Sequence, residues 1–237
     1  MDTRYIKNLP NLITEEQQEQ LLTKHIGVIG CGGNGGYVIE FLARLGIKEL
    51  SFWDGDIFEE SNLNRQIFCF EDTIGYNKAE TAEQYVKKIN SNIICNSYSH
   101  YFGKTEDLLS AAKCDIIIIC SDTGHNWENN RTIFHELLLR NIPIVDEAIN
   151  STCVWIKIFT KDNINEFDED TRRRKQWVNN ETNISQPSYI CSLAASITLI
   201  ETVKYLTEQF SQALNGCIEF EINNMKIHRS IHNRRIY

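Results

Sequence analysis

The sequence predicts an α/β fold of the Rossmann type: a largely parallel sheet with helices on both faces, extended by antiparallel strands at the C-terminal end. Short apolar runs alternate with stretches of helical periodicity, which is the order of βαβ units. A glycine-rich turn over 30–35 follows the first of these runs and opens a helix. Residues 153–159 and 216–230 alternate apolar and polar side chains, which is typical of antiparallel strands. These three observations carry the fold prediction.

Length and composition indicate one globular domain over 1–237. A chain of 237 residues can bury a sizeable core, and 24% charged with 42% hydrophobic residues argues against a disordered chain. The net charge of −8 argues against general nucleic-acid binding. No apolar run approaches the roughly 18 residues of a membrane span, and the N-terminus lacks the apolar region of a signal peptide. We therefore expect a cytoplasmic protein that does not bind a membrane.

The elements follow in chain order from their local patterns. Residues 15–24 begin with two glutamates and predict a helix within an N-terminal helical segment, 1–25. The apolar run 26–29 is typical of a buried parallel strand, and the apolar residues within 38–45 recur at helical spacing. The same two patterns predict strands at 50–53, 93–98, 115–120 and 142–145, and helices at 77–90, 105–112, 127–140 and 189–208.

The stretch 160–187 is polar and charged, and predicts a mobile crossover loop. It contains the basic cluster 172–175 (RRRK), which is either a solvated face or a contact for an anionic substrate. After the helix 189–208, residues 216–230 predict a hairpin with a two-residue turn at 223–224. The C-terminal part therefore extends the parallel sheet with antiparallel strands.

The glycine turn has the composition of a phosphate site. Glycines let backbone amides approach a phosphate closely, and the start of the following helix adds free N–H groups and the positive end of the helix dipole. Asp54 ends the next predicted strand about 20 residues after the turn, where a ribose hydroxyl needs an acceptor. The alternative is a tight turn without a ligand. The candidate contacts in the turn are Gly30, Gly32, Gly33 and Gly35.

The segment after Asp54 indicates which nucleotide binds. Residues 61–66 (SNLNRQ) place a cation and three amide side chains beside the predicted site. A triphosphate requires such a group, whereas a nicotinamide cofactor does not. The candidate contacts from this segment are Asp56, Asn62, Asn64, Arg65 and Gln66.

Two further charged residues lie at the ends of predicted elements. Lys78 falls in the first turn of the helix 77–90, where the helix dipole disfavours a cation, so an external phosphate would explain it. The alternative for Lys78 is an exposed helix lysine. Asp122 follows the strand 115–120 at the edge of the sheet where ligands gather, and magnesium prefers one or two carboxylates with phosphate oxygens. Asp122 is therefore a candidate Mg²⁺ ligand, the alternative being a cap of the next helix.

Residues 61–66, 74–80 (IGYNKAE) and 120–122 (CSD) resemble the ThiF/MoeB/HesA family, the bacterial relatives of ubiquitin-activating enzymes. The resemblance covers most of residues 20–150. It implies an ATP-dependent adenylyltransferase that forms an acyl-adenylate from a carboxylate, releases pyrophosphate and works as a homodimer. It does not identify the substrate, which could be a carrier-protein C-terminus, a peptide, a modified tRNA base or a small-molecule acid.

The resemblance also implies roles for the candidate residues. Gly32 and Gly35 would form the amide cradle for the phosphates, and Asp54 would bind the ribose. Asn62 and Gln66 would orient the phosphates. The catalytic residues would be Arg65 and Lys78, which stabilise the phosphate charge, and Asp122, which holds Mg²⁺.

The chain departs from the family pattern at several points. Lys7 stands where the family commonly has an arginine that reaches the partner subunit's ATP site, and lysine lacks the bidentate fork. Thr123 follows Asp122 where the family has asparagine. The eight cysteines form no Cys-x-x-Cys pair, so we expect no structural zinc.

The crossover 160–187 holds no cysteine, although related activators place their reactive cysteine there. Cys153 falls in a predicted strand, and Cys191 falls near the start of an apolar helix, where packing is the expected role. We therefore expect no thioester-forming cysteine. The alternatives are an activator of a ubiquitin-like or sulfur-carrier protein that uses a cysteine such as Cys191, an NAD-dependent oxidoreductase, or a non-catalytic nucleotide-binding protein.

Overall fold

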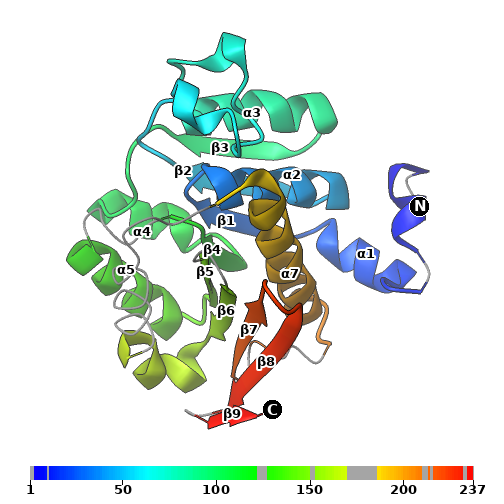
Figure 1. The fold of residues 1–237 in the computed structure, drawn as a ribbon, viewed down its shortest axis with the longest axis vertical. Coiled ribbons are helices and arrows are strands. Elements are labelled where there is room, and N and C mark those ends of the chain that lie inside the picture. Colours follow the sequence, from blue (N-terminus) through cyan, green and yellow to red (C-terminus); the bar gives the residue numbers. More distant parts are fainter. Residues whose placement is uncertain are drawn as a thin grey trace.

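The computed structural model describes residues 3–9, 11–121, 127–149, 153–169, 186–209, 213, 216–231 and 234–236. Within them, one nine-stranded sheet has the order β3-β2-β1-β4-β5-β6-β7-β8-β9 (Figure 1). Its strands are β1 (His25–Ile29), β2 (Glu49–Trp53), β3 (Ile94–Tyr98), β4 (Ile116–Ile119), β5 (Ile144–Ile149), β6 (Cys153–Phe159), β7 (Cys217–Glu221), β8 (Lys226–Ile231) and β9 (Arg234–Ile236).

The helical elements connect these strands in the order that the sequence predicts. They are the 3₁₀ turns η1 (Thr3–Asn8), η2 (Glu60–Asn62), η3 (Glu71–Thr73) and η4 (Lys161–Asn163), and the helices α1 (Glu15–Leu21), α2 (Gly33–Leu45), α3 (Lys78–Ile89), α4 (Thr105–Ala111), α5 (Trp127–Leu139) and α7 (Ser188–Leu206).

The sheet has a parallel half and an antiparallel half. Strands β3, β2, β1, β4 and β5 pair in parallel, and every pairing from β5 to β9 is antiparallel. The chain moves outward from β1 to β3 and then crosses back to place β4 on the other side of β1. Ligands bind in open α/β sheets at such a reversal, outside the carboxyl ends of the strands. The predicted Rossmann-like class with antiparallel C-terminal strands is confirmed.

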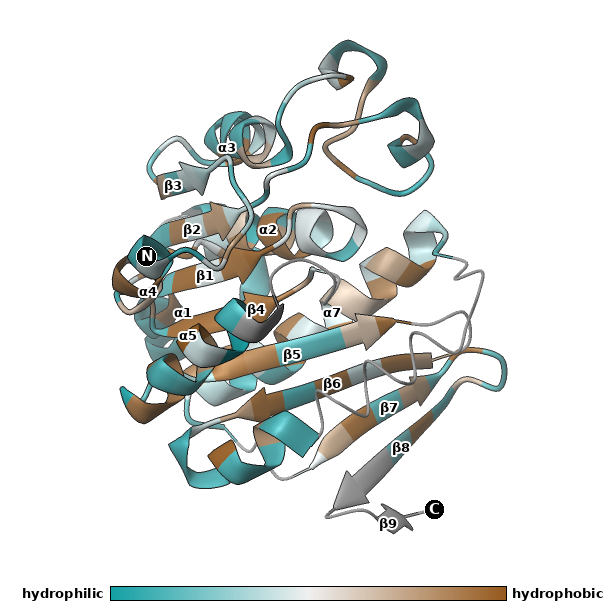
Figure 2. Ribbon diagram, turned by 90° about the vertical axis from the view of Figure 1, so that its left-hand side faces the viewer, coloured by the Kyte–Doolittle hydropathy of each residue, from teal (hydrophilic) through white to brown (hydrophobic). Residues whose placement is uncertain are grey.

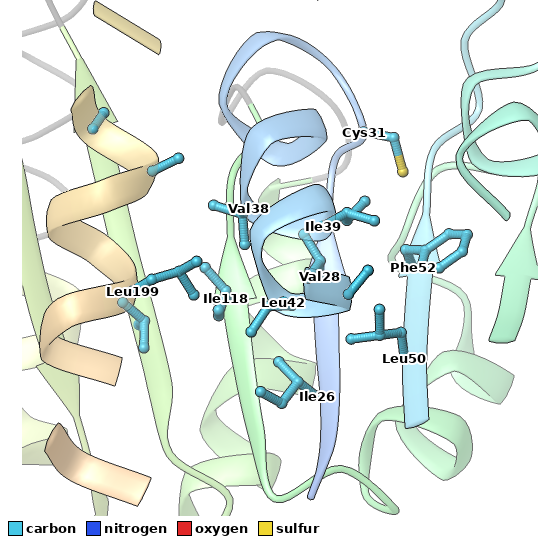
Figure 3. Packing of buried hydrophobic residues seen from close by; sticks show 14 of the residues in the cluster. Ile26, Val28, Cys31, Val38, Ile39, Leu42, Leu50, Phe52, Ile118 and Leu199 are labelled. Carbon is cyan, nitrogen blue, oxygen red and sulfur yellow. The ribbon is translucent and has the colours of Figure 1, made fainter. Parts of the chain in front are cut away.

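Helices cover both faces of the parallel half. The isoleucines of β4 show this alternation: Ile116 and Ile118 join the cluster under α2, α3 and α7, whereas Ile117 and Ile119 join the cluster under α4 and α5. The central strands are mostly hydrophobic along their length (Figure 2). In Figure 3, Leu42 of α2 points onto the sheet. Burying each such aliphatic side chain stabilises the fold by about 1.5–3 kcal/mol.

The N-terminal segment is fixed to the ends of two helices. Gly46 ends α2 in the left-handed conformation (φ 90°), and a Cβ there would lie 2.4 Å from the ring of Tyr5. The buried Tyr5 hydroxyl accepts a hydrogen bond from Asn90 Nδ2 at 2.8 Å, just beyond α3. Arg4 donates to Asn90 Oδ1 at 2.7 Å. This segment therefore packs on the helix ends that lie away from the glycine turn.

Three expected boundaries were wrong. Strand β5 continues through Asp146 and Glu147 to Ile149, and both acidic side chains are buried rather than placed at a strand end. Residues 161–169 of the expected loop are helical, while 170–185, with the basic cluster 172–175, lie outside the described residues. Glu221 pairs with Lys226, so the hairpin has four connecting residues instead of two.

Helix α7 is, in the described ranges, the one helix long and apolar enough to meet the length and composition expected of a membrane span. It packs against α2 and β5, and its inward face buries polar Thr198, Glu201 and Thr202 as well as apolar residues. A core helix of a globular protein can meet the same criterion, and 44% of this stretch of α7 is buried.

Candidate functional site at the carboxyl ends of the strands

A cleft of about 710 Å³ lies where β1, β2 and β4 end. Its walls come from the glycine turn, from the ends of β2 and β4, and from the segment that leads to α3. Tyr101, Phe102, Asn130 and Gln186 also line it. Of the predicted site residues, the cleft is lined by Gly30, Gly32, Gly33, Asp54, Asp56, Asn62, Arg65, Gln66 and Lys78.

Two predicted residues lie beside the cleft rather than on it, and a third is not tested. Gly35 and Asn64 are not among the residues that line the cleft, although each supports one that is. Asp122, the predicted Mg²⁺ ligand, lies outside the described residues, as does Thr123. Within the described ranges no cluster of three or more His, Cys, Asp and Glu side chains could hold a metal. Both the magnesium site and the expected lack of zinc therefore stay predictions.

Two glycines hold the turn against the sheet. Gly30 has φ 95°, and a Cβ there would meet the Cys120 carbonyl and the Ser121 amide at 3.0 Å, at the end of β4. A Cβ at Gly35 would lie 1.8 Å from the Gly30 carbonyl oxygen. The first turn of α2 therefore sits directly on the end of β1. Its leading backbone amides have no partner within the helix and are available to an anion.

Asp54 ties the glycine turn to β2. Its carboxylate accepts hydrogen bonds from the Cys31 amide at 2.7 Å and from the Asp56 amide at 2.9 Å, and the residue is only 8% exposed. Burial raises the pKa of Asp54, and the two amide hydrogen bonds oppose that rise. The predicted ribose contact would use the oxygen lone pairs that these amides leave.

Lys78 is buried at the first position of α3, so an exposed helix lysine is excluded. Asn77 caps the helix by accepting hydrogen bonds from the Ala79 and Glu80 amides. The Asn77 amide group also donates to the carbonyls of Asp54 and Asp56, each at 3.0 Å. These bonds set the start of α3 against the end of β2. The Lys78 ammonium lies 3.2 Å from Asp56 Oδ2, with its side chain 10% exposed.

Arg65 is held beside the glycine turn, next to Gly33. Its Nη1 donates to the Ser61 carbonyl at 3.0 Å and to Asn64 Oδ1 at 2.9 Å. Asn64 therefore orients the guanidinium rather than lining the cleft itself. Asn62 accepts a hydrogen bond from the Glu59 amide and so shapes the turn that carries Arg65. The arginine and Lys78 are the cations that line the described part of the cleft.

Two buried amide oxygens in the cleft have no hydrogen-bond partner among the described residues: Gln66 Oε1 and Asn34 Oδ1. Such an orphan costs about 1–3 kcal/mol. Because the oxygen and nitrogen of an amide can exchange places, each group can accept from or donate to a ligand. Gln66 lies against Gly32, beside the start of α2. A polar ligand with phosphate and hydroxyl groups fits this lining.

Sequence reasoning missed several residues of the site. Asn34 is the only position from 32 to 36 that is not glycine, which makes it the one side chain within that stretch. Tyr101 follows β3 in the adjacent connection and reaches the end of β2. The rule that ligands gather at strand ends could have found Tyr101. Nothing in the sequence around Asn130 indicates a role in the site, because only the folded structure brings α5 to the cleft.

Cys191 lies at the base of the site but is closed off from it. Its Sγ is 3.1 Å from the position of a Cβ on Gly33, close to Arg65, and the residue is fully buried. Burial raises the pKa of the Cys191 thiol to about 11, so the thiol is neutral at pH 7. Cys153 is the first residue of β6, as expected. These positions favour packing as the role of Cys191.

The family model of the ThiF family matches residues 5–235. The chain belongs to the ThiF family. The resemblance seen in residues 61–66, 74–80 and 120–122 is thereby confirmed, and it extends over nearly the whole chain. Each of these three segments contributes to the lining of the cleft.

Two curated relatives each match part of the chain. The SAMP-activating enzyme E1 of Haloferax volcanii is 31% identical over 134 residues, which is 56% of this chain and 48% of that protein. The tRNA threonylcarbamoyladenosine dehydratase of Haemophilus influenzae is 42% identical over 85 residues, which is 36% of this chain and 33% of that protein. The chain thus matches half or less of the length of these relatives.

Solved structures with the same fold include E. coli MccB. The structure of MccB with ATP has a TM-score of 0.80 at 22% identity and covers 99% of this chain and 73% of that one. A structure of MccB with AMPCPP and MccA has a TM-score of 0.74 at 22% identity and covers 92% and 66% of the two chains. At this identity the likeness establishes the shared fold.

Proposed function

We propose that this protein is an ATP-dependent adenylyltransferase that activates a carboxylate as an acyl-adenylate and releases pyrophosphate. The observation that carries the proposal is that two cations, Lys78 and Arg65, line the same cleft as the glycine turn. A buried lysine at the start of a helix is costly unless anions pair it. A polyphosphate bound at the start of α2 meets both cations. Membership of the ThiF family and the likeness to MccB with ATP support the choice of ATP.

The reaction follows from charge. A carboxylate oxygen of the substrate forms a bond to the α-phosphorus of ATP, the bond from that phosphorus to the bridging oxygen breaks, and pyrophosphate leaves. Both reactants are anions, so catalysis is mainly positioning and neutralisation of charge. Arg65 and Lys78 supply positive charge, and Gln66 and the first amides of α2 orient the phosphates. No general base is needed, because the carboxylate is already ionised at pH 7.

Asp122 is the residue of this chain that we propose for Mg²⁺. The cation would offset the charge that accumulates on the phosphates as pyrophosphate leaves. Asp54 is proposed for the ribose, since both its position at the end of β2 and its fixed carboxylate suit a hydroxyl donor.

We propose that the acyl-adenylate passes directly to a nucleophile in the same cleft, without a thioester. A transferring thiol must come within about 3–3.5 Å of the acyl carbon. Cys191 is buried and neutral, and part of α7 would have to unfold to release it. The second candidate is activation of a ubiquitin-like or sulfur-carrier protein through a cysteine such as Cys191, which the similarity to the SAMP-activating enzyme favours.

The names of the relatives differ in the substrates that they state, so we propose four classes of carboxylate to test: carrier-protein C-termini, peptides, modified tRNA bases and small acids. We further propose a cytoplasmic homodimer. Light scattering at micromolar concentration should give twice the mass of the chain, and a monomer there would remove both the dimer and any role for Lys7 across an interface.

The experiment for the proposed function is pyrophosphate release from Mg-ATP when each class of carboxylate is added. We expect release with one class and none with the corresponding amide, which lacks the attacking oxygen. Calorimetry should also show binding of Mg-ATP and none of NAD. Tight NAD binding without ATP binding would overturn the proposal in favour of an oxidoreductase. ATP binding with no pyrophosphate release for any class would favour a non-catalytic protein.

A further inference from the structure

The strongest remaining feature of the cleft is the way in which Lys78 is paired. The lysine side chain is 10% exposed, and its ammonium lies 3.2 Å from Asp56 Oδ2. Asp56 is itself 45% exposed on the cleft wall. A buried ammonium needs an anionic partner, whereas a half-exposed carboxylate is solvated with or without one. The pair therefore matters far more to Lys78 than to Asp56.

Asp56 stands where it would compete with a nucleotide. A carboxylate beside a polyphosphate is repelled by it, because like charges at close range disfavour each other. In the free protein, however, Asp56 pairs with Lys78, which is the cation that would contact a phosphate bound at the start of α2. A residue in that position cannot serve both as the partner of Lys78 and as a neighbour of the bound phosphates.

Tyr101 holds the other oxygen of Asp56. Its hydroxyl donates a hydrogen bond to Asp56 Oδ1, and this bond is the largest cause of the raised pKa of Tyr101. The Tyr101 ring lies against Gly55, where a Cβ would come within 2.9 Å of ring atoms. The hydrogen bond from Tyr101 to Asp56 therefore does not depend on Lys78.

We propose that Asp56 is a resident counter-ion of Lys78, which the polyphosphate of a nucleoside triphosphate displaces, with Tyr101 as the positioning residue that retains the released carboxylate. The proposal rests on the proposed function, and it revises the expectation that Asp56 contacts the nucleotide. In the free protein, Asp56 keeps Lys78 neutralised and in place. When phosphate binds, Lys78 changes partner and Asp56 stays on Tyr101, facing solvent.

This exchange sets opposite expectations for two isosteric variants. Asp56→Asn removes the competing charge, so Lys78 should bind phosphate more tightly. Tyr101→Phe removes the hydroxyl but keeps the ring on Gly55, so Asp56 should hold Lys78 more strongly. Once Asp56 has become Asn, the Tyr101 hydroxyl no longer has a carboxylate charge to act on, so removing it should have no further effect.

The experiment is calorimetry of the full chain with Mg-ATP and, separately, with inorganic tripolyphosphate in the absence of magnesium. Relative to the unchanged protein, we expect Asp56→Asn to increase the affinity for tripolyphosphate about tenfold. The reason is that the variant removes the negative charge that competes with the ligand for Lys78. Tyr101→Phe should weaken Mg-ATP by about three- to fivefold, the net effect of one ordinary hydrogen bond, because the carboxylate of Asp56 is half exposed to solvent. The double variant should match Asp56→Asn within about twofold. Tyr98→Phe is the matched control, because Tyr98 stacks on Trp53 and should leave both affinities unchanged.

Each other outcome has a defined meaning. If Asp56→Asn weakens both ligands, or weakens Mg-ATP alone, Asp56 is a direct or magnesium-mediated contact and the counter-ion proposal is wrong. If it changes neither affinity, Lys78 does not exchange partners and the proposal is again wrong. Asp56→Ser provides a second test if the asparagine variant unfolds. If the unchanged protein binds neither ligand, the proposed function fails first, which separates the two failures.

Discussion

The two ends of the parallel strands are both polar, but among the described residues their polar groups are paired differently. At the amino end, His25 Nε2 lies 2.8 Å from Ser51 Oγ, and His25 Nδ1 lies 3.1 Å from the Lys113 carbonyl. Asn96 donates to Ser51 and to Glu49. At the carboxyl end, Gln66 Oε1 and Asn34 Oδ1 are buried without a partner among the described residues, and a cleft of about 710 Å³ adjoins them.

This difference separates polar residues that stabilise the fold from polar residues that are placed to bind a ligand. The amino end satisfies its groups internally, so removing one group should cost stability. The carboxyl end leaves acceptors and cations facing a cavity, so removing one should cost binding or catalysis. The predictions below test whether the two ends respond in these separate ways.

The largest effect should come from the cations of the carboxyl end. Lys78→Ala and Arg65→Ala should each reduce pyrophosphate release about 10²-fold or more, because each removes positive charge that stabilises the transition state. Lys24→Ala is the control at the amino end, where Lys24 is a partly exposed lysine 3.9 Å from Asp115. Such pairs contribute little, so activity should not change. Equal losses for Lys24 and Lys78 variants would remove the distinction between the two ends.

The amino end should respond in stability alone. Ser51→Ala removes an almost fully buried hydroxyl that is a hydrogen-bond partner of both His25 and Asn96. This loss should lower the free energy of unfolding by about 1–3 kcal/mol. Urea unfolding measures this loss, and calorimetry should find Mg-ATP affinity unchanged. A weaker ATP affinity in a fully folded variant would show that the amino end also acts on the site.

The same end should give a weak pH dependence. Burial lowers the pKa of His25, against the opposing charge of Glu49, so the unfolded chain binds a proton more readily than the folded one. The stabilising contribution is complete above the unfolded pKa of about 6.5 and is lost as pH falls through the lower folded value. The free energy of unfolding, measured in urea, should therefore fall less steeply between pH 7.5 and 5 for His25→Gln than for the unchanged protein. Equal slopes would contradict the burial of His25.

The smallest effect should come from Cys191, which lies at the carboxyl end but behaves as part of the core. Cys191→Ser should leave turnover within about threefold, because a neutral buried thiol takes no part in the transfer. Intact mass should show no thiol-sensitive adduct with Mg-ATP and the accepted substrate. Loss of product with pyrophosphate release preserved would instead identify Cys191 as a nucleophile.

Much of the site was predictable because its residues follow one another along the chain. The glycine turn, Asp54, Arg65 and Lys78 come from a single βαβα stretch, where local pattern fixes each element. Asn34 and Asn130 were missed because a polar residue on a helix carries no local indication that it faces a cleft. The burial of Asp146 and Glu147 was missed for the converse reason, since acidic residues after an apolar run suggest a strand end.

The most direct test of the account is hydrogen–deuterium exchange with and without Mg-ATP. The account predicts added protection at 30–37, 54–56, 65–66 and 77–79, where the glycine turn, the end of β2 and the start of α3 surround the cleft. Segments 24–26, 48–51 and 113–116 at the amino end should exchange at unchanged rates, and NAD should protect none of these segments. Protection at the amino end, or none at the glycine turn while ATP is bound, would contradict it.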